Sequence, residues 1–276
     1  MTNSTPLPLV SIITPVYNGA SYLDALIESV QEQDYPNIEH IIIDDGSTDG
    51  GATIDVLRKY PHLHWWTRPN RGQYATMNEG LLSAQGEVIC FICADDILLP
   101  GAVATAMAYL SSHPECVGVY GNYSFINSEG KALIFIQPMR NLSTNLYPYS
   151  LHIAHSSLYI WKKPLIQNDL MFTDPLRYVG DYSWIVRVLK AKLRIGRIKN
   201  ELSMIRVHEL QTSKKSFYAM RKEMFDVQEQ LNISRFWASF FRKLWFLINL
   251  INAAKLNGIK SAIAIVSERW RMRSEI

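Results

Sequence analysis

Two adjacent carboxylates, Asp95 and Asp96, directly follow an apolar run in the middle of the chain. The run, Val88 to Cys93, is apolar at both alternating positions, which predicts a strand buried on both faces, and such strands are normally parallel. Acids at the carboxyl end of such a strand lie where open α/β sheets bind ligands. Because two neighbouring like charges are costly to ionise, a divalent cation and a hydroxyl-rich ligand would stabilise them. The alternative is that the pair forms only a turn and the cap of a helix from Ala102 to Leu110.

Two later polar residues could act on the same ligand. Asp181 leads a predicted helix whose inward face is otherwise apolar, with Trp184, Ile185 and Val188. It is either a helix cap or a general base that partial burial makes more basic. His208 follows a predicted strand, 202–207, and either completes a metal shell or contacts a diphosphate, or is simply structural.

The elements that must position these residues form a repeating pattern in the first third of the chain. Apolar strands are predicted at 9–14, 39–43, 63–67 and 88–93, and helices at 22–33, before Tyr60, at 74–84 and from Ala102. Four strand-helix units in a row predict a mostly parallel sheet with helices on both faces. Polar or acidic clusters end the first, second and fourth strands, so we expect them to meet at one edge.

No glycine-rich phosphate loop of either common type occurs in the chain, neither G-x-G-x-x-G after the first strand nor G-x-x-x-x-G-K-[ST] anywhere. A bound nucleotide would therefore need a metal to neutralise its phosphates, and paired acids suit that task.

The pattern changes after Leu110. Strands are predicted at 117–121, 133–136 and 157–161, and a polar helix at 217–233. The segment from Pro138 to Tyr149 is irregular and is either a loop on the acceptor side or a plain surface connection.

Composition sets the broad class of the protein. With 276 residues, 48% hydrophobic and 19% charged, the chain is long enough for one large domain or one domain with an appendage. Three cysteines suit a reducing compartment. Cys90 and Cys93 have the spacing of a redox or metal pair, but residues three apart on a strand point to opposite faces, so we expect no pairing between them. The first eight residues lack a secretory signal pattern, and no apolar run is long enough to span a bilayer.

The last 63 residues are basic, with 12 Lys and Arg against 5 Asp and Glu from Lys214 onward. Aromatic and aliphatic residues alternate with this charge between 235 and 273, which favours contact with anionic lipid headgroups. A helical cap on the sheet or a dimer contact is the alternative. A nucleic-acid binder is a further reading, but no recognition motif for RNA or DNA is present.

Five motifs in order resemble family 2 glycosyltransferases of the GT-A fold. The first two motifs are residues 11–19, SIITPVYNG, and residues 43–49, IDDGSTD. Asn70-Arg71-Gly72-Gln73 with Asn78 and Gly80, then Ala94-Asp95-Asp96 through Pro100-Gly101, and Gly180-Asp181-Tyr182 complete the set. The resemblance covers residues 9 to 213. It implies a Rossmann-like central sheet in a GT-A domain at 1–213, with a nucleotide-binding part at 9–115 and an acceptor-side part at 116–213. A helical extension follows at 214–276.

The resemblance also implies a role for each matching residue. Asp181 would be the catalytic base, and Asp96 would ligate Mn²⁺ or Mg²⁺ with His208 as a second metal or diphosphate contact. The donor nucleotide, of the UDP type, would be bound by Thr14, Pro15, Val16, Tyr17, Asp45, Gln73 and Asp95, with Asp45 accepting a ring N–H of the base. Two positions depart from the family pattern: Ala94 replaces the first acid of D-x-D, and Gly180 replaces a Glu.

The function implied is an inverting, metal-dependent transfer of one sugar from a nucleotide sugar to a glycan or lipid-linked glycan, in cell-surface polysaccharide synthesis. The Gln-x-x-Arg-Trp segment of polymerising members is absent after Asp181, so a single sugar is expected per encounter. We expect a cytoplasmic protein at the inner face of the cell membrane, with the homodimer left open as its assembly. A catalytically silent sugar-nucleotide binding or scaffold protein with the same fold is the alternative.

Overall fold

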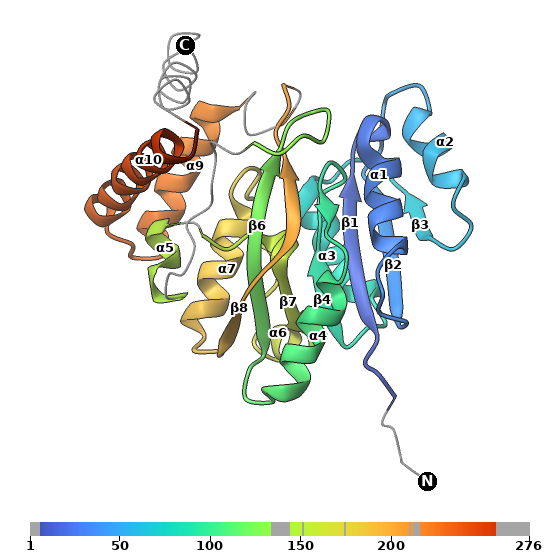
Figure 1. The fold of residues 1–276 in the computed structure, drawn as a ribbon. Helices are drawn as coiled ribbons and strands as arrows, with labels where there is room; N and C mark the ends of the chain where they lie inside the picture. Colours follow the sequence, from blue (N-terminus) through green and yellow to red (C-terminus); the bar gives the residue numbers. More distant parts are fainter. Residues whose placement is uncertain are drawn as a thin grey trace.

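A mixed eight-stranded sheet forms the centre of the protein, with the strand order β3-β2-β1-β4-β7-β6-β8-β5 (Figure 1). The computed structural model describes residues 6–133, 144–150, 152–173, 175–209, 211 and 216–257. The strands are β1 (Val10–Val16), β2 (Ile38–Asp44), β3 (His64–Thr67), β4 (Val88–Phe91), β5 (Ile97–Leu98), β6 (Gly118–Ile126), β7 (Leu158–Trp161) and β8 (Ile195–Arg206).

The first half of the sheet is parallel, as the strand-helix repeat predicts. β1 pairs with β2 on one side and with β4 on the other, and β2 pairs with β3, all in parallel. Every residue of β1 and of β4 is buried, which agrees with the apolar sequence of β4 and the mostly apolar sequence of β1, where Ser11 and Thr14 are buried polar residues. Because β1, β2 and β4 are neighbours and run the same way, the segments that follow them lie at one edge of the sheet.

The second half of the sheet is mixed, although four of the seven strand pairings in the whole described sheet are parallel. β7 runs antiparallel to both β4 and β6, and the short β5, which the sequence patterns did not predict, is antiparallel to β8. Only β6 and β8 are parallel there. A four-residue apolar run such as Leu158–Trp161 carries no local signal of its direction, so strand polarity was not predictable at β7. The strand predicted at 133–136 lies, apart from Leu133, outside the described residues.

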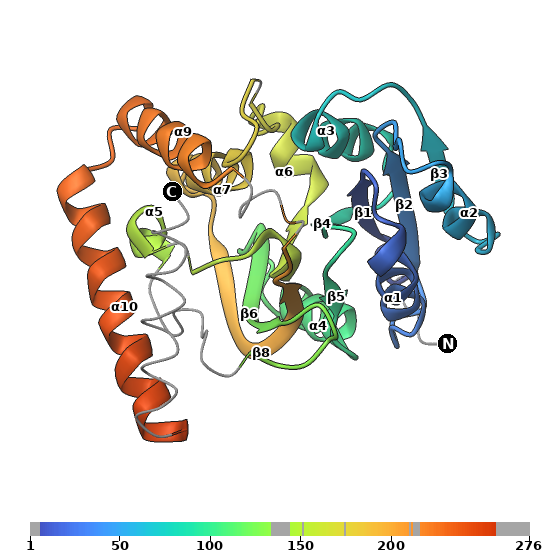
Figure 2. The same ribbon diagram turned by 90° about the horizontal axis from the view of Figure 1, so that it is seen from above.

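Helices cover both faces of the sheet (Figure 2). One face carries α1 (Ala20–Gln31), α2 (Ala52–Arg58) and α4 (Ala102–Ser112), whose apolar residues pack in one core cluster with β1 and β4. The other face carries α3 (Gln73–Ser83), α6 (Lys162–Gln167) and α7 (Gly180–Lys190), whose apolar residues form a second cluster. Short helical turns, η1 (Thr144–Leu146), α5 (Tyr147–Ser150) and η2 (His155–Ser157), connect the elements of the second half.

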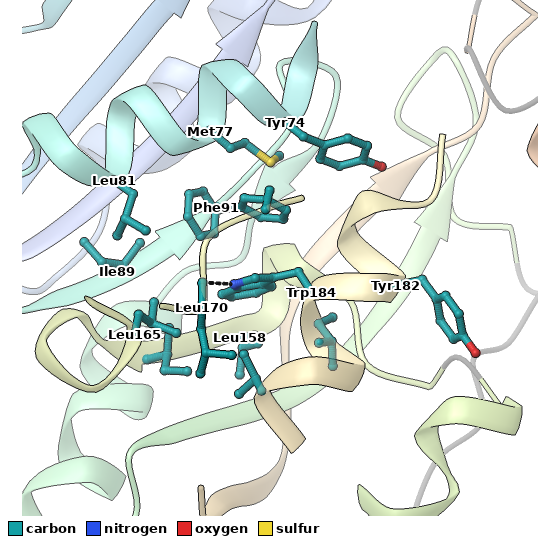
Figure 3. Packing of buried hydrophobic residues seen from close by; sticks show 14 of the residues in the cluster. Tyr74, Met77, Leu81, Ile89, Phe91, Leu158, Leu165, Leu170, Tyr182 and Trp184 are labelled. Carbon is teal, nitrogen blue, oxygen red and sulfur yellow. Dashed lines mark hydrogen bonds between the residues drawn. The ribbon is translucent and has the colours of Figure 1, made fainter. Parts of the chain in front are cut away.

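Aromatic rings pack against one another among the aliphatic side chains of the second core cluster (Figure 3). Trp184 of α7 is 1% exposed, and its indole N–H donates to the carbonyl of Leu170 at 2.8 Å. Its ring stacks on Phe172 and meets Phe91 of β4 edge to face. This packing fixes the rotation of α7 about its axis and therefore the direction in which Asp181, one turn earlier, points.

The last two described helices differ in how they are anchored. On α9 (Phe217–Gln230), Val227 is buried in the second core cluster, and the Glu223 carboxylate accepts the backbone N–H groups of Arg177, Tyr178 and Val179 just before α7. α10 (Arg235–Asn257) lies at the end of the molecule opposite β3, beside α5 (Figures 1 and 2). Among the described residues, no helix combines the length and the apolar character needed to cross a bilayer.

Candidate active site at the carboxyl ends of β1, β2 and β4

The loops after β1 and β2 are joined to each other. Asn18, at φ 52°, accepts the Thr48 N–H on its side-chain oxygen at 2.7 Å, and its own N–H donates to Ser47 Oγ at 2.8 Å. Tyr17 stands half exposed beside Thr48. Thr14, Pro15 and Val16, predicted to bind the donor, are buried in β1, and Thr14 Oγ1 lies 3.1 Å from Nε2 of His40. Of the four neighbouring residues predicted to bind the donor, 14–17, Tyr17 is the one whose side chain the structure exposes.

Asp45 holds the next loop in place. Its carboxylate accepts the backbone N–H groups of Arg71 at 2.8 Å and Gly72 at 2.9 Å, and it pairs with the Arg68 guanidinium. Asp45 is 3% exposed, and these partners fill three of the about four acceptor positions of its carboxylate. The bonds from Asp45 to Arg71 and Gly72 also fix the start of α3. Its first residue is Gln73, and the side-chain amide nitrogen of Gln73 lies 3.4 Å from the Cys93 sulfur.

A tight turn at the end of β4 brings the acidic pair together with Cys93. The Asp96 N–H donates to the Cys93 carbonyl at 3.1 Å, which closes a four-residue turn. Asp96 is 4% exposed and accepts the Arg206 N–H at 3.1 Å. Burial, and then the charge of Asp95, raises the pKa of Asp96 well above its usual value. The two acids therefore repel each other as predicted, and a cation would relieve the cost.

His208 faces the other member of the pair. Its Nε2 lies 3.0 Å from Asp95 Oδ2, and its ring lies against Tyr22 of α1. Its Nδ1 is buried with no hydrogen-bond partner among the residues that the structure describes. Because the two ring nitrogens point in different directions, the nitrogen that faces the acidic pair is Nε2.

Arg206 is a structural residue of this site that the sequence reasoning did not identify. Its guanidinium lies over the Tyr22 ring at 4.6 Å, donates through Nε to the Asp95 carbonyl at 2.9 Å, and also bonds the carbonyls of Asn127 and Ser128. It is almost fully buried and locks the acidic turn against β8. A lone Arg at the end of a strand has no sequence signal that would separate it from a surface residue.

Asp181 lies at the start of α7 with its side chain 37% exposed. The Tyr74 hydroxyl donates to Oδ1 at 3.2 Å, and His155 Nδ1 lies 3.6 Å from Oδ2. Burial raises the pKa of Asp181, but hydrogen bonding and charge from His155, with the Tyr182 N–H and the Tyr74 hydroxyl, outweigh it, so the pKa lies below its ordinary value. The expectation that burial makes this carboxylate more basic is therefore wrong, because the donors around it favour the ionised form.

His155 and Cys93 connect Asp181 to the acidic turn. His155 Nε2 lies 3.3 Å from Cys93 Sγ on the side of the ring opposite Asp181. Burial, and then the charges of Asp96, Asp95 and Asp181, raises the pKa of the Cys93 thiol well above its usual value. Three carboxylates thus face one thiol. Cys90 points into the opposite core cluster, as predicted, and all three cysteines carry free thiols.

The sequence reasoning named neither His155 nor Cys93 as part of the site. One usable signal was the Cys93-Ala94-Asp95-Asp96 spacing, which a turn converts into adjacent side chains. The other was the polar His155-Ser156-Ser157 step directly before the apolar β7.

The donor set fits a divalent cation. The buried Asp96 carboxylate carries a raised pKa beside a second acid, and a ring nitrogen of His155 lies within 4.8 Å of one of its oxygens. Carboxylate oxygen and imidazole nitrogen together suit Mn²⁺, and carboxylate oxygen suits Mg²⁺. The residues present therefore fit the metal that the resemblance implies.

Comparison with known proteins finds similarity to glycosyltransferases. Residues 11–167 match the family model of Glycosyl transferase family 2. An uncharacterized glycosyltransferase of Haemophilus influenzae is 35% identical over 204 residues, covering 70% of this chain and 81% of that protein. An uncharacterized glycosyltransferase of Rickettsia felis is 29% identical over 248 residues, 86% of this chain and 39% of its own length, so the chain spans well under half of that relative. A putative teichuronic acid biosynthesis glycosyltransferase of Bacillus subtilis, TuaG, is 32% identical over 131 residues, 46% of this chain and 51% of that protein.

Solved structures share the fold. Residues 1–349 of Staphylococcus aureus TarS in complex with UDP-GlcNAc align with a TM-score of 0.65 at 18% identity, covering 97% of this chain and 73% of that chain. The mannosyltransferase PcManGT from Pyrobaculum calidifontis, in complex with GDP-Man and Mn²⁺, aligns with a TM-score of 0.57 at 18% identity, covering 98% of this chain and 83% of that chain.

Proposed function

The chain belongs to glycosyl transferase family 2 and has the GT-A fold, and on this premise we propose that it transfers one sugar from a nucleotide sugar to a glycan or lipid-linked glycan, with inversion. The observation that carries the proposal is the convergence of five separate segments on one place. Asp45 fixes the loop before Gln73, Gln73 and His155 contact Cys93 in the acidic turn, and His155 faces Asp181. A contiguous set of polar side chains at the carboxyl ends of parallel strands is where this kind of sheet binds ligands.

The donor is proposed to lie across the ends of β1 and β2. Tyr17 would contact the base, the remaining acceptor position of Asp45 would take its N–H, and Gln73 and Asp95 would contact ribose or sugar. The likeness in fold to proteins crystallised with UDP-GlcNAc and with GDP-Man supports a nucleotide-sugar donor, for which we propose the UDP type.

Asp96, with His208 as a second ligand, is proposed to hold Mn²⁺ or Mg²⁺. When bound, the cation would act as a Lewis acid for the leaving nucleoside diphosphate. Asp96 needs no rearrangement of the turn to serve, because Arg206 and the Cys93 carbonyl already hold its backbone and one carboxylate oxygen.

Asp181 is proposed to take the proton of the acceptor hydroxyl as that oxygen attacks the anomeric carbon from the face opposite the diphosphate. Its lowered pKa keeps the carboxylate ionised at neutral pH, so the base is always ready. The Tyr74 hydroxyl and the His155 ring hold the carboxylate in one orientation, and its partial exposure leaves it open to the acceptor.

The outer face of α10 supports a lipid-linked acceptor. Phe236 is 71% exposed, and it continues into a row of exposed apolar side chains along the helix, together with the exposed cation Lys243. The row is Phe236, Trp237, Phe240, Leu244, Leu247, Ile248 and Ile251. Buried apolar area and cations add up in binding to an anionic lipid surface. We therefore propose that the protein acts at the inner face of the cell membrane. The likeness to TuaG supports a role in cell-surface polysaccharide synthesis.

Two experiments test these assignments. Incubation of the full chain with a panel of nucleotide sugars and Mn²⁺ should raise its melting temperature for one donor, and a lipid-linked acceptor should then gain one sugar. Donor binding with no transfer to any acceptor would favour the silent binding protein. In flotation with anionic vesicles, the full chain should float, and a Phe236→Ser/Phe240→Ser variant should not. Equal flotation of both would refute the role of α10.

A further inference from the structure

The Cys93 thiol, an Asp96 carboxylate oxygen and a His155 ring nitrogen lie within 4.8 Å of one another. They come from two segments about 60 residues apart, since Cys93 and Asp96 share the turn after β4 and His155 opens η2 before β7. Asp96 and His155 lie at the proposed active site, whereas the thiol has no part in the proposed transfer reaction. The cluster therefore calls for its own explanation.

We propose that these three side chains form a metal site selective for a thiophilic divalent ion such as Zn²⁺ or Co²⁺. Sulfur, imidazole nitrogen and carboxylate oxygen are the protein ligands of Zn²⁺, and three of them leave the fourth position open. Bond lengths of a tetrahedral zinc centre require ligand atoms about 3.4–3.6 Å apart. The Cys93 sulfur and His155 Nε2 already stand 3.3 Å apart. Binding would release the thiol proton to solvent, because the ligand is the thiolate.

The partners of the two His155 ring nitrogens also support a metal site. A histidine that binds a metal through one ring nitrogen usually directs its other N–H to a carboxylate, which fixes the tautomer and the ring orientation. His155 has this arrangement before any metal binds: Nδ1 faces Asp181 at 3.6 Å, and Nε2 faces Cys93. With the proton on Nδ1, the lone pair of Nε2 points at the cluster. The Gln73 amide beside the sulfur would stabilise a thiolate by donating to it.

The site rests on the proposed function in sharing Asp96 and His155 with it. Hard ions such as Mg²⁺ and Mn²⁺ prefer oxygen ligands and gain little from the thiol, whereas Zn²⁺ gains much. A thiophilic ion at this site would occupy Asp96 and hold the His155 ring between the ion and Asp181. It would therefore act as an inhibitor that competes with the cation used in transfer.

Cobalt is the probe, because a thiolate bound to Co²⁺ gives a charge-transfer absorption band in the near ultraviolet. The reduced full chain is titrated with Co²⁺ without nucleotide, as wild type, Cys93→Ser, His155→Gln and the control Cys116→Ser, whose thiol is buried outside the cluster. The band should form in wild type and in Cys116→Ser, be absent in Cys93→Ser, and need at least about tenfold more Co²⁺ in His155→Gln. Circular dichroism and thermal melting confirm that each variant is folded.

Three results would overturn the proposal: no band in wild type at saturating Co²⁺, an equal band in folded Cys93→Ser, or loss of the band in folded Cys116→Ser. The Cys93–His155 contact would then be a hydrogen bond and nothing more. Since the spectrum needs no donor and no turnover, it decides this site separately from the transfer reaction. An active transferase without the band would keep the proposed function and refute the thiolate site.

Discussion

Replacing Asp181 by Asn is the sharpest perturbation of the proposed reaction, because it removes the proton acceptor and keeps the shape. The amide can still accept from Tyr74, so α7 and the packing of Trp184 should be undisturbed. Loss of a general base typically costs about 10²–10⁴ in rate, equal to about 3–5 kcal/mol in the activation barrier. Donor affinity should change little, because the proposed donor contacts are on other segments.

The assay is single-turnover transfer with saturating donor and Mn²⁺, together with calorimetry of donor binding. Asp55→Asn is the matched control, since Asp55 is an exposed acid on α2 that pairs only with Arg58 across one turn among the described residues. The rate should fall for Asp181→Asn and stay at the wild-type value for the control. A rate for Asp181→Asn within a few-fold of wild type, with donor binding intact, would refute the assignment of the base.

The pH dependence of kcat/KM tests the role of the Asp181 carboxylate independently. Its pKa is lowered, so the acid limb of kcat/KM attributable to this group should lie at a lower pH than for an ordinary aspartate. Removing the Tyr74 hydroxyl with Tyr74→Phe takes away a donor to the ionised form, and the limb should move to higher pH. A limb that moves to lower pH would contradict the stated origin of the shift.

Three further predictions concern the metal, the core and a buried histidine. Asp96→Ala should abolish the Mn²⁺-dependent part of nucleotide binding, as measured by calorimetry with and without Mn²⁺. Equal affinities of the wild type under the two conditions would contradict this prediction, because binding would then have no Mn²⁺-dependent part. Trp184→Ala should lower the free energy of unfolding by about 3–5 kcal/mol, whereas the half-exposed Trp237→Ala should cost less than about 1 kcal/mol, as measured by urea unfolding. Burial, and then the charge of His62, lowers the pKa of His40 to about 3. Between about pH 6.5 and 3 the unfolded chain therefore binds more protons at this residue than the folded chain does. The free energy of unfolding consequently falls as the pH falls through this range. Between pH 7 and 5 this one residue should cost about 2 kcal/mol, and His40→Gln should remove that part of the pH dependence.

Local sequence patterns determined which segments become strands and helices in the first third of the chain. The buried β1 and β4, the amphipathic α1 and the acids at the ends of β2 and β4 all follow from periodicity and from the residues that interrupt it. The family resemblance also follows from short motifs. Neighbouring parallel strands then place their end residues at one edge by geometry alone, which is why the location of the site was predictable.

Tertiary structure alone decided what each of these residues does at that edge. The antiparallel direction of β7 brings His155 between Cys93 and Asp181, and that contact reverses the expected pKa shift of the carboxylate. Asp45 turned out to hold the loop before Gln73, and Arg206 came from β8 to lock the acidic turn. These contacts join residues separated by 25 to more than 100 positions, and no local pattern specifies such pairs. They depend on how the strands are ordered and directed in the sheet, because only that arrangement sets which side chains meet.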